Sequence, residues 1–185
     1  MFENIRADFL RFAALETRVV ALPRLFIENC GFQSVLVYRF GRTLHLAPKF
    51  LGWTVALPFW ALYGLAVAYI RLGYGIYISL DASIGAGFYV GHFGGIDIRR
   101  CSIGRRCSIG QQTRIGPSTE KGRGPVIGDN VWMGAHSCVL GEVNVGDGST
   151  IGAGTTVSVD VASGSLVMGQ PLRVIQQNYS NVHLM

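Results

Sequence analysis

Aliphatic side chains recur at every sixth position over the second half of the chain. The series runs through Ile127, Met133, Val139, Val145, Ile151 and Val157. Glycine directly follows four of these residues, and a small or β-branched residue stands four places after each. Such a unit predicts a short strand followed by a turn, with the aliphatic side chain inside and the glycine at the corner where the backbone bends. Three units form one triangular coil of about 18 residues, and the coils stack as parallel strands.

The same period extends toward the N-terminus, with one slip and one insertion. Aliphatic residues recur at Ile78, Ile84, Val90 and Ile96 and then, after a slip of one residue, at Ile103, Ile109 and Ile115. The stretch GPSTEKGRGPV, residues 116–126, has no aliphatic residue at the expected sixth place and predicts a loop that leaves the repeat. We expect about five coils between residues 76 and 162, stabilised by stacking because no coil buries its core alone.

The N-terminal part follows a different pattern. Residues 1–49 carry apolar and charged residues at helical spacing, and LGWTVALPFWALYGLAVAYI, residues 51–70, contains no charge. About twenty apolar residues suffice to span a bilayer, but Pro58 would kink or break such a helix. The segment crosses a membrane, dips into it and returns, or packs on neighbouring subunits. We therefore expect a helical, membrane-associating region at 1–74 with its apolar segment at 50–70, a β-helix domain at 75–175 and a C-terminal tail at 176–185.

Charge is sparse and unevenly distributed. Only 15% of the 185 residues are charged and 49% are hydrophobic, which argues against a disordered chain. Residues 1–76 contribute +4 (8 Lys/Arg less 4 Asp/Glu) to the net charge of +5, and residues 77–185 contribute +1 (8 less 7). The positive charge therefore accompanies the apolar region. This favours an anionic membrane surface over nucleic acid, for which the chain carries no binding motif.

Three stretches of the repeat region read GIYISLDASIGAGFYVGHFGGIDI, VIGDNVWMGAHSCVLGEVNVGDGSTIGAGTTV and MGQPLRVI. They resemble the serine acetyltransferase family of hexapeptide-repeat acyltransferases. Within the family, the chain is most similar to the branch that acts in capsule and exopolysaccharide synthesis. The resemblance implies a mainly β fold, a left-handed parallel β-helix behind a helical region, and a homotrimer with active sites between adjacent subunits. It also implies acetyl-CoA as the co-substrate.

His92 is the candidate catalytic residue, because it stands where the family carries its catalytic histidine. The resemblance implies acyl transfer from a thioester to a hydroxyl. A hydroxyl is a weak nucleophile near neutral pH, and an imidazole is suited to take its proton as general base. The alternative is a corner histidine bonded to the backbone. Tyr77 replaces the family's acidic partner of this histidine and can orient the ring without supplying charge, while Asp81 and Asp97 are carboxylates nearby in sequence.

The resemblance also implies contacts to both substrates. Arg123 matches the arginine that binds the carboxylate of the amino-acid acceptor, but Gly124 replaces the second histidine of the serine enzymes, which argues against free serine. Gln111, one coil after His92, and Asp97 are candidate acceptor contacts. Arg173 either reaches a CoA phosphate or is a solvated basic residue. The pantetheine arm is expected along small residues at the corners of the C-terminal coils, namely Gly134, Ala135, Gly152, Ala153 and Gly154.

Two other features leave alternatives open. The pairs Arg99–Arg100 and Arg105–Arg106 lie six residues apart. They either bind a diphosphate or an anionic glycan, or they form a solvated face. A zinc site made of three histidines is not expected, because the repeat contains only His92 and His136.

We therefore expect an acetyl-CoA-dependent O-acetyltransferase that modifies a sugar or lipid-linked glycan during exopolysaccharide, capsule or cell-envelope synthesis. Its expected place is the cytoplasmic side of a bacterial inner membrane, with no nucleic-acid partner. The alternatives are a serine O-acetyltransferase of cysteine biosynthesis and a catalytically degenerate, membrane-bound β-helix scaffold.

Overall fold

The computed structural model describes residues 2–15, 28–46, 53–91, 94–119, 122–169 and 173–177. Three helices precede the strands: α1 (Phe2–Leu15), α3 (Cys30–Leu46) and α4 (Trp53–Tyr74). The strands are β1 (Ile76–Ile78), β2 (Ser83–Ile84), β3 (Tyr89–Val90), β4 (Ile96–Ile98), β5 (Ser102–Ile103), β6 (Ser108–Ile109), β7 (Arg114–Gly116), β8 (Val126–Ile127), β9 (Trp132–Met133), β10 (Cys138–Leu140), β11 (Asn144–Val145), β12 (Thr150–Ile151), β13 (Thr156–Val157), β14 (Leu166–Met168) and β15 (Arg173–Gln176).

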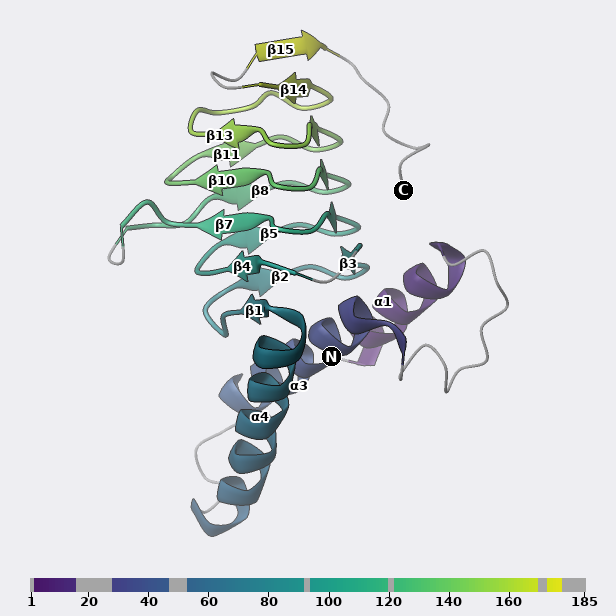
Figure 1. The fold of residues 1–185 in the computed structure, drawn as a ribbon, viewed down its shortest axis with the longest axis vertical. Helices are drawn as coiled ribbons and strands as arrows, with labels where there is room; N and C mark the ends of the chain where they lie inside the picture. The colour runs from purple at the N-terminus through teal and green to yellow at the C-terminus, as the bar shows by residue number, and fades with distance from the viewer. Residues whose placement is uncertain are drawn as a thin grey trace.

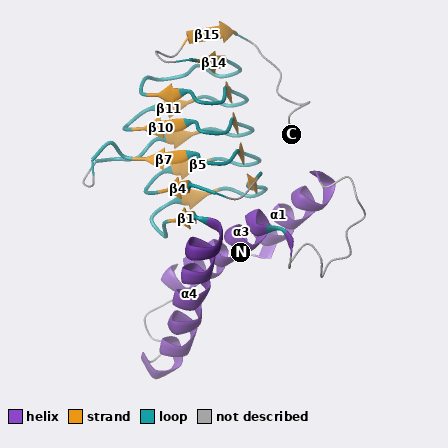
Figure 2. Cartoon of the chain, viewed as in Figure 1, coloured by secondary structure: helices purple, strands orange, loops and turns teal. Residues whose placement is uncertain are grey.

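The strands form a stack of coils with three sheets as its sides (Figures 1 and 2). Sheet A has the order β1-β4-β7-β10-β13, sheet B has β2-β5-β8-β11, and sheet C has β3-β6-β9-β12-β14-β15. All strand pairs are parallel except β14 with β15. The prediction of a parallel β-helix behind a helical region is confirmed.

The repeated aliphatic residues fill the inside of the coils. All thirteen predicted positions from Ile78 to Val157 are buried, none more than 9% exposed. The loop predicted at 116–126 is also present, because β7 ends at Gly116 and β8 begins at Val126. In Figure 1 this connection projects from the stack beside β7.

One part of the predicted phase is wrong. Ile98, and not Ile96, pairs with Ile78 in the coil before it and with Ile115 in the coil after it. Ile96 is buried too, but it pairs with Ile76, two places earlier on the strand. Because both isoleucines face inward, the sequence pattern alone did not distinguish them. Two extra residues therefore lie before Ile98, and the next repeat is shortened by one.

The helices dock on the first coil through a buried ion pair. Arg39 Nε of α3 lies 2.9 Å from Asp8 Oδ2 of α1, and both side chains are buried. The same guanidinium donates to the carbonyl oxygens of Ile84 (2.6 Å) and Gly85 (2.5 Å), and Asp8 Oδ1 accepts from the N–H of Phe88 (2.9 Å). Two helices and the first coil thus share one fully paired polar network.

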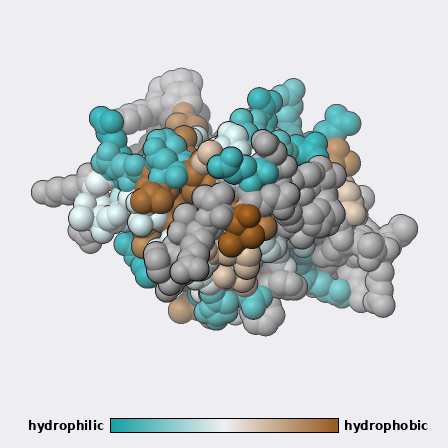
Figure 3. Space-filling model, turned by 90° about the horizontal axis from the view of Figure 1, so that it is seen from above, coloured by the Kyte–Doolittle hydropathy of each residue, from teal (hydrophilic) through white to brown (hydrophobic). Residues whose placement is uncertain are grey.

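Helix α4 projects away from the β-helix in Figure 1 and contains most of the apolar segment predicted at 50–70. Its exposed large apolar side chains are Leu57, Phe59, Trp60, Leu62, Leu65, Tyr69 and Leu72. Within the described part of the chain, no helix combines the length and the apolar character that crossing a membrane requires. The expectation of a long apolar segment is corrected accordingly, since Pro58, Gly64 and several tryptophan and tyrosine residues lower the mean hydropathy of the run. Seen from above, hydrophobic side chains form separate patches among hydrophilic ones (Figure 3).

Candidate active site

His92 lies outside the described residues, but both sides of its corner are placed. The N–H of Gly91 donates to the carbonyl of Ile109 (2.8 Å), and the N–H of Gln112 donates to the carbonyl of Gly94 (2.8 Å). Val90 pairs with Ile109 and Asp97 with Arg114, so six residues (91–96) turn this corner where four (110–113) turn the next. The two extra residues before Ile98 are therefore located beside the predicted catalytic histidine.

The wider corner depends on glycine. Gly94 and Gly95 have φ angles of 108° and 63°, in the region that other residues rarely adopt. A Cβ on Gly95 would also lie 2.9 Å from Cγ of Gln112.

Tyr77, Asp97, Arg114 and Cys138 form a column on the outer face of sheet A. The strand register pairs Tyr77 with Asp97, Asp97 with Arg114, and Arg114 with Cys138. Successive side chains of a strand point to opposite faces. Because Ile76, Ile78, Ile96 and Ile98 are buried, Tyr77 and Asp97 face outward.

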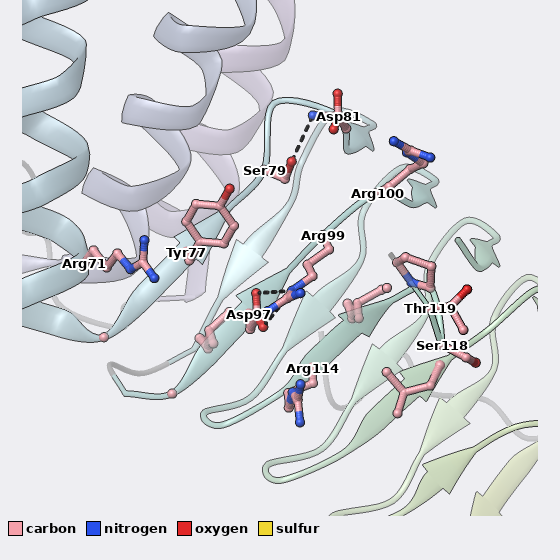
Figure 4. A pocket seen from close by; sticks show the side chains of 17 residues that line it. Arg71, Tyr77, Ser79, Asp81, Asp97, Arg99, Arg100, Arg114, Ser118 and Thr119 are labelled. Atoms are coloured by element: carbon pink, nitrogen blue, oxygen red, sulfur yellow. Dashed lines mark hydrogen bonds and ion pairs between the residues drawn. The ribbon is translucent and has the colours of Figure 1, made fainter. Parts of the chain in front are cut away.

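A groove of about 820 Å³ runs along this column and is here named the arginine groove. Figure 4 shows its lining side chains, which come from the end of α4, from β1, β4 and β7, and from the loop after β7. Its polar and charged residues are Arg71, Tyr77, Ser79, Asp81, Asp97, Arg99, Arg100, Arg114, Ser118 and Thr119. The groove begins at the histidine corner, because Gly95 and Ile96 belong to its wall.

Arginine dominates the charge of the groove, with four arginines against two aspartates. Arg99 Nε lies 3.1 Å from Asp97 Oδ2, and the guanidinium of Arg71 lies 5.3 Å from the centre of the Tyr77 ring. Ser79 Oγ accepts a hydrogen bond from the N–H of Asp81 (3.1 Å). Arg100 and Arg114 make no ion pair with any described residue.

The structure brings together only part of the predicted acceptor site. Tyr77 and Asp97 line the groove, but Arg123 and Gln111 do not. Arg123 is exposed on the loop after β7, and its N–H donates to Glu142 Oε1 (3.2 Å). Gln111 turns the corresponding corner of the next coil, where its carbonyl accepts from the N–H of His136 (2.8 Å).

Sequence reasoning missed Arg71, Ser79 and Arg114 as groove residues. Arg114 follows Asp97 by one coil, so the correct phase would have placed the two side by side. Arg71 belongs to α4, and no repeat pattern connects it with the strands. The two arginine pairs are also separated, since Arg99 and Arg100 line the groove whereas Arg105 pairs with Asp129 (3.6 Å) outside it.

Gly124 has no room for a side chain. A Cβ at this position would lie 1.7 Å from the carbonyl oxygen of Arg100, far inside van der Waals contact. A histidine at position 124 is therefore incompatible with this path of the backbone.

The residues predicted to contact CoA form a column along one corner of the stack. A Cβ on Gly134 would lie 2.6 Å from the backbone nitrogen of Ala153, and one on Gly152 would lie 2.6 Å from Cγ of Met168. Coil-to-coil packing thus already requires Gly134, where the clash is with backbone, whereas the side chain of Met168 could move away from a Cβ at Gly152. Ala153 and Gly154 are exposed at the corner and Ala135 is half-buried, so an extended ligand arm can approach their backbone. The backbone of Arg173 begins β15, but its side chain is outside the described part.

The described residues contain no group of three or more histidine, cysteine, aspartate or glutamate side chains that could hold a metal ion. All four cysteines are free thiols, with Cys101 and Cys107 buried inside the coils.

Comparison with known proteins supports an acyltransferase type of β-helix. Residues 124–158 match the family model described as bacterial transferase hexapeptide (six repeats). A serine acetyltransferase of Bacillus subtilis (strain 168) is 39% identical over 111 residues, which are 58% of this chain and 51% of that protein. A Staphylococcus aureus (strain COL) relative that carries an acetyltransferase name is 46% identical over 55 residues, 29% of this chain and 28% of its own. The chain thus spans about half or less of the length of these curated relatives.

Solved structures share the fold over nearly the whole chain. Serine acetyltransferase of Neisseria gonorrhoeae superposes with a TM-score of 0.80 at 23% identity, over 97% of this chain and 67% of that one. The Brucella abortus (strain S19) serine acetyltransferase in complex with coenzyme A gives a TM-score of 0.74 at 20% identity, over 96% and 68%. At these identities the likeness establishes the fold alone.

Proposed function

We propose that this hexapeptide-repeat chain is an acetyl-CoA-dependent O-acetyltransferase that acetylates a sugar hydroxyl, with His92 as general base. One observation carries the proposal: Gly95 and Ile96, which line the arginine groove, belong to the same six-residue connection (91–96) as His92. The groove is large enough for a sugar, since small-molecule sites typically measure about 300–1,000 Å³. The relatives named as acetyltransferases support acyl transfer as the reaction class.

In this proposal, His92 takes the proton of the acceptor hydroxyl while the oxygen attacks the thioester carbonyl. The new C–O bond forms, the C–S bond breaks, and the imidazolium returns its proton to the departing thiolate. Asp97 supplies the carboxylate that Tyr77 does not, from the neighbouring strand of the same face. Acetyl-CoA is a co-substrate, and exposed Ala153 and Gly154 with half-buried Ala135 are the described residues that fit its extended arm.

A glycan hydroxyl is a better acceptor than free serine for two structural reasons. Gly124 cannot carry the second histidine of the serine enzymes, because its backbone lies against the carbonyl of Arg100. Arg123, the expected carboxylate ligand of an amino acid, is exposed and outside the groove. The alternative, serine O-acetyltransferase activity, is favoured by the 39% identical relative, which is named a serine acetyltransferase. An assay with L-serine as the acceptor distinguishes the two.

The setting of the enzyme is also part of the proposal. The exposed apolar side chains of α4 and the positive charge of the N-terminal region support association with an anionic membrane surface, on the cytoplasmic side of a bacterial inner membrane. A lipid-linked glycan of capsule or exopolysaccharide synthesis is the acceptor that fits this place. Assembly as a homotrimer and the left hand of the β-helix follow from the resemblance to serine acetyltransferases.

The test measures CoA release by the purified protein with acetyl-CoA and three classes of acceptor: L-serine, neutral oligosaccharides and phosphorylated sugars. His92→Asn should lower turnover by roughly 10²–10⁴-fold while the circular dichroism spectrum and oligomer size stay unchanged. His45→Asn, at an exposed position of α3, is the control and should retain activity. Full turnover by His92→Asn would falsify the assignment of the base. Preference for L-serine would support the alternative, and failure to bind acetyl-CoA in calorimetry would support a degenerate scaffold.

A further inference from the structure

The arginine groove concentrates positive charge on one face of a β-helix that is otherwise nearly neutral. Residues 77–185 contain eight Lys/Arg and seven Asp/Glu. Three of those eight basic residues, Arg99, Arg100 and Arg114, line this groove, and Arg71 joins them from α4. The four arginines face two aspartates there, which leaves a local formal charge of +2.

The arginines of the groove differ in what they already contact. Arg99 is paired with Asp97, and Arg71 lies over the ring of Tyr77. Arg100 and Arg114 line the groove with no ion pair to a described residue, and the carboxylate of Asp81 is exposed. Among the described residues, these two guanidinium groups are thus the groove arginines without an acidic partner or an aromatic ring beside them.

We infer that Arg100 and Arg114 form a subsite for an oxyanion of the acceptor, a phosphate or a sugar carboxylate. A guanidinium presents a planar set of N–H donors that binds either group in a bidentate manner. The hydroxyls of Ser79, Ser118 and Thr119 supply further donors on the groove wall. This inference rests on the proposed function and deepens it, because it makes the acceptor anionic rather than a neutral sugar.

The subsite also implies how the acceptor is oriented between the arginines and the histidine corner. The wall of the groove passes from Gly95 at the histidine corner to Leu140 on β10 and includes Arg71 at the end of α4. In this inference the anionic group of the acceptor lies at Arg100 and Arg114, and its sugar lies along the groove toward Gly95.

The test is calorimetric titration of the whole protein with inorganic pyrophosphate, glucuronate and glucose. Both anions should bind measurably and glucose should not, with pyrophosphate favoured for a phosphate acceptor and glucuronate for an acidic sugar. Arg100→Gln and Arg114→Gln should each weaken binding of the anion by about tenfold or more, and the double variant further. Arg105→Gln, which removes an exposed guanidinium outside the groove, is the matched control and should bind as the wild type does.

Acetyl-CoA carries phosphates of its own, so the titration is repeated at saturating CoA. If the arginines belong to the acceptor subsite, the anion still binds, and the arginine variants bind CoA normally. Loss of anion binding in the presence of CoA, or weaker CoA binding by Arg100→Gln, would overturn the inference. So would unchanged anion affinity in the double variant.

These outcomes are independent of turnover. If the anion binds through Arg100 and Arg114 but no acetyl transfer to any acceptor is found, the subsite stands and the proposed function fails. If transfer to neutral sugars is efficient and anions do not bind, the proposed function stands and the subsite fails.

Discussion

Tyr77 and Asp97 are paired residues on the neighbouring parallel strands β1 and β4, and their side chains leave the same face of the β-helix. The column therefore contains a carboxylate, but one coil away from the position at which the resemblance led us to look for an acid. That carboxylate is shared with Arg99, whose Nε lies 3.1 Å away. Asp97 thus connects the histidine corner with the arginine groove.

We predict opposite effects of Asp97→Asn on catalysis and on anion binding. In the proposed mechanism Asp97 supports the base, so its loss should lower kcat by about 10²-fold or more with little change in the KM for acetyl-CoA. Removal of the same negative charge frees Arg99, so pyrophosphate should bind more tightly in calorimetry. Tyr77→Phe is the comparison and should cost less than tenfold in kcat. A larger loss in Tyr77→Phe than in Asp97→Asn would assign the supporting role to the tyrosine.

The buried pair of Asp8 and Arg39 should dominate the attachment of the helices. Asp8→Asn leaves the Arg39 guanidinium without its counter-charge, and breaking a buried ion pair typically costs about 3–5 kcal/mol. For a chain of this length we expect the Tm to fall by roughly 6–20 °C. Differential scanning calorimetry measures it.

Arg105→Gln is the control for that measurement, because the Arg105 side chain is 74% exposed and its Nε lies 3.6 Å from Asp129 Oδ2. Exposed pairs contribute at most about 1 kcal/mol. Equal shifts in Asp8→Asn and Arg105→Gln would show that the buried network does not carry the attachment.

The two thiols inside the coils should make the protein less stable at alkaline pH. Burial raises the pKa of Cys101 to about 12 and that of Cys107 to about 11. Both thiols therefore stay neutral in the native state while they ionise near pH 9 in the unfolded chain. Their contribution is complete below about pH 8.5 and is lost as the pH rises toward the native values, by on the order of 1 kcal/mol per thiol at pH 10.

Urea unfolding at pH 7.5, 9 and 10 under reducing conditions measures whether the free energy of unfolding falls as the pH rises. The double variant Cys101→Ala/Cys107→Ala should lose less stability between pH 7.5 and 10 than the wild type, although it starts lower. Cys138→Ala, on the outer face, should lose as much unfolding free energy between pH 7.5 and 10 as the wild type does. If all three proteins lose the same amount, the two buried thiols are not the cause.

Gly124→Ala should displace the loop after β7. Its Cβ would overlap the carbonyl oxygen of Arg100, so either the loop or the Arg100 backbone must move. We expect a loss of about 1–3 kcal/mol in unfolding free energy and weaker anion binding. Gly64→Ala is the control, because no atom lies within 4 Å of a Cβ there and alanine favours a helix. Unchanged stability of Gly124→Ala would contradict the close approach.

The sequence predicted the coils well because the repeat obliges every sixth side chain to fill a narrow core. All thirteen aliphatic positions are buried. The error at Ile96 and Ile98 arose because β4 buries both isoleucines, and hydrophobicity cannot report which of two inward residues is in register. The strand pairing across the stack decides which isoleucine is in register. Predicting that pairing requires knowing how many residues turn the corner between β3 and β4.

The site was less predictable for a related reason. A groove on the outer face is formed by residues that are neighbours only across coils, such as Asp97 and Arg114, or that arrive from a helix, as Arg71 does. Outward positions obey no hydrophobic pattern, so their order depends entirely on the register. The resemblance pointed to Tyr77, which lines the groove, to Arg123, which does not, and to His92, which lies outside the described residues.

The reversed direction of β15 has a consequence for how the molecules behave toward one another. A stack of coils ends in strands with free backbone groups, and such edges invite another chain to add on. In sheet C, β15 occupies the edge of β14 at one end, while Arg11 of α1 donates to Gly87 just before β3 at the other. Among the described strands of sheet C, the last one thus runs against the others. A second copy could not continue the parallel coils in register on β15, because that strand presents an antiparallel edge.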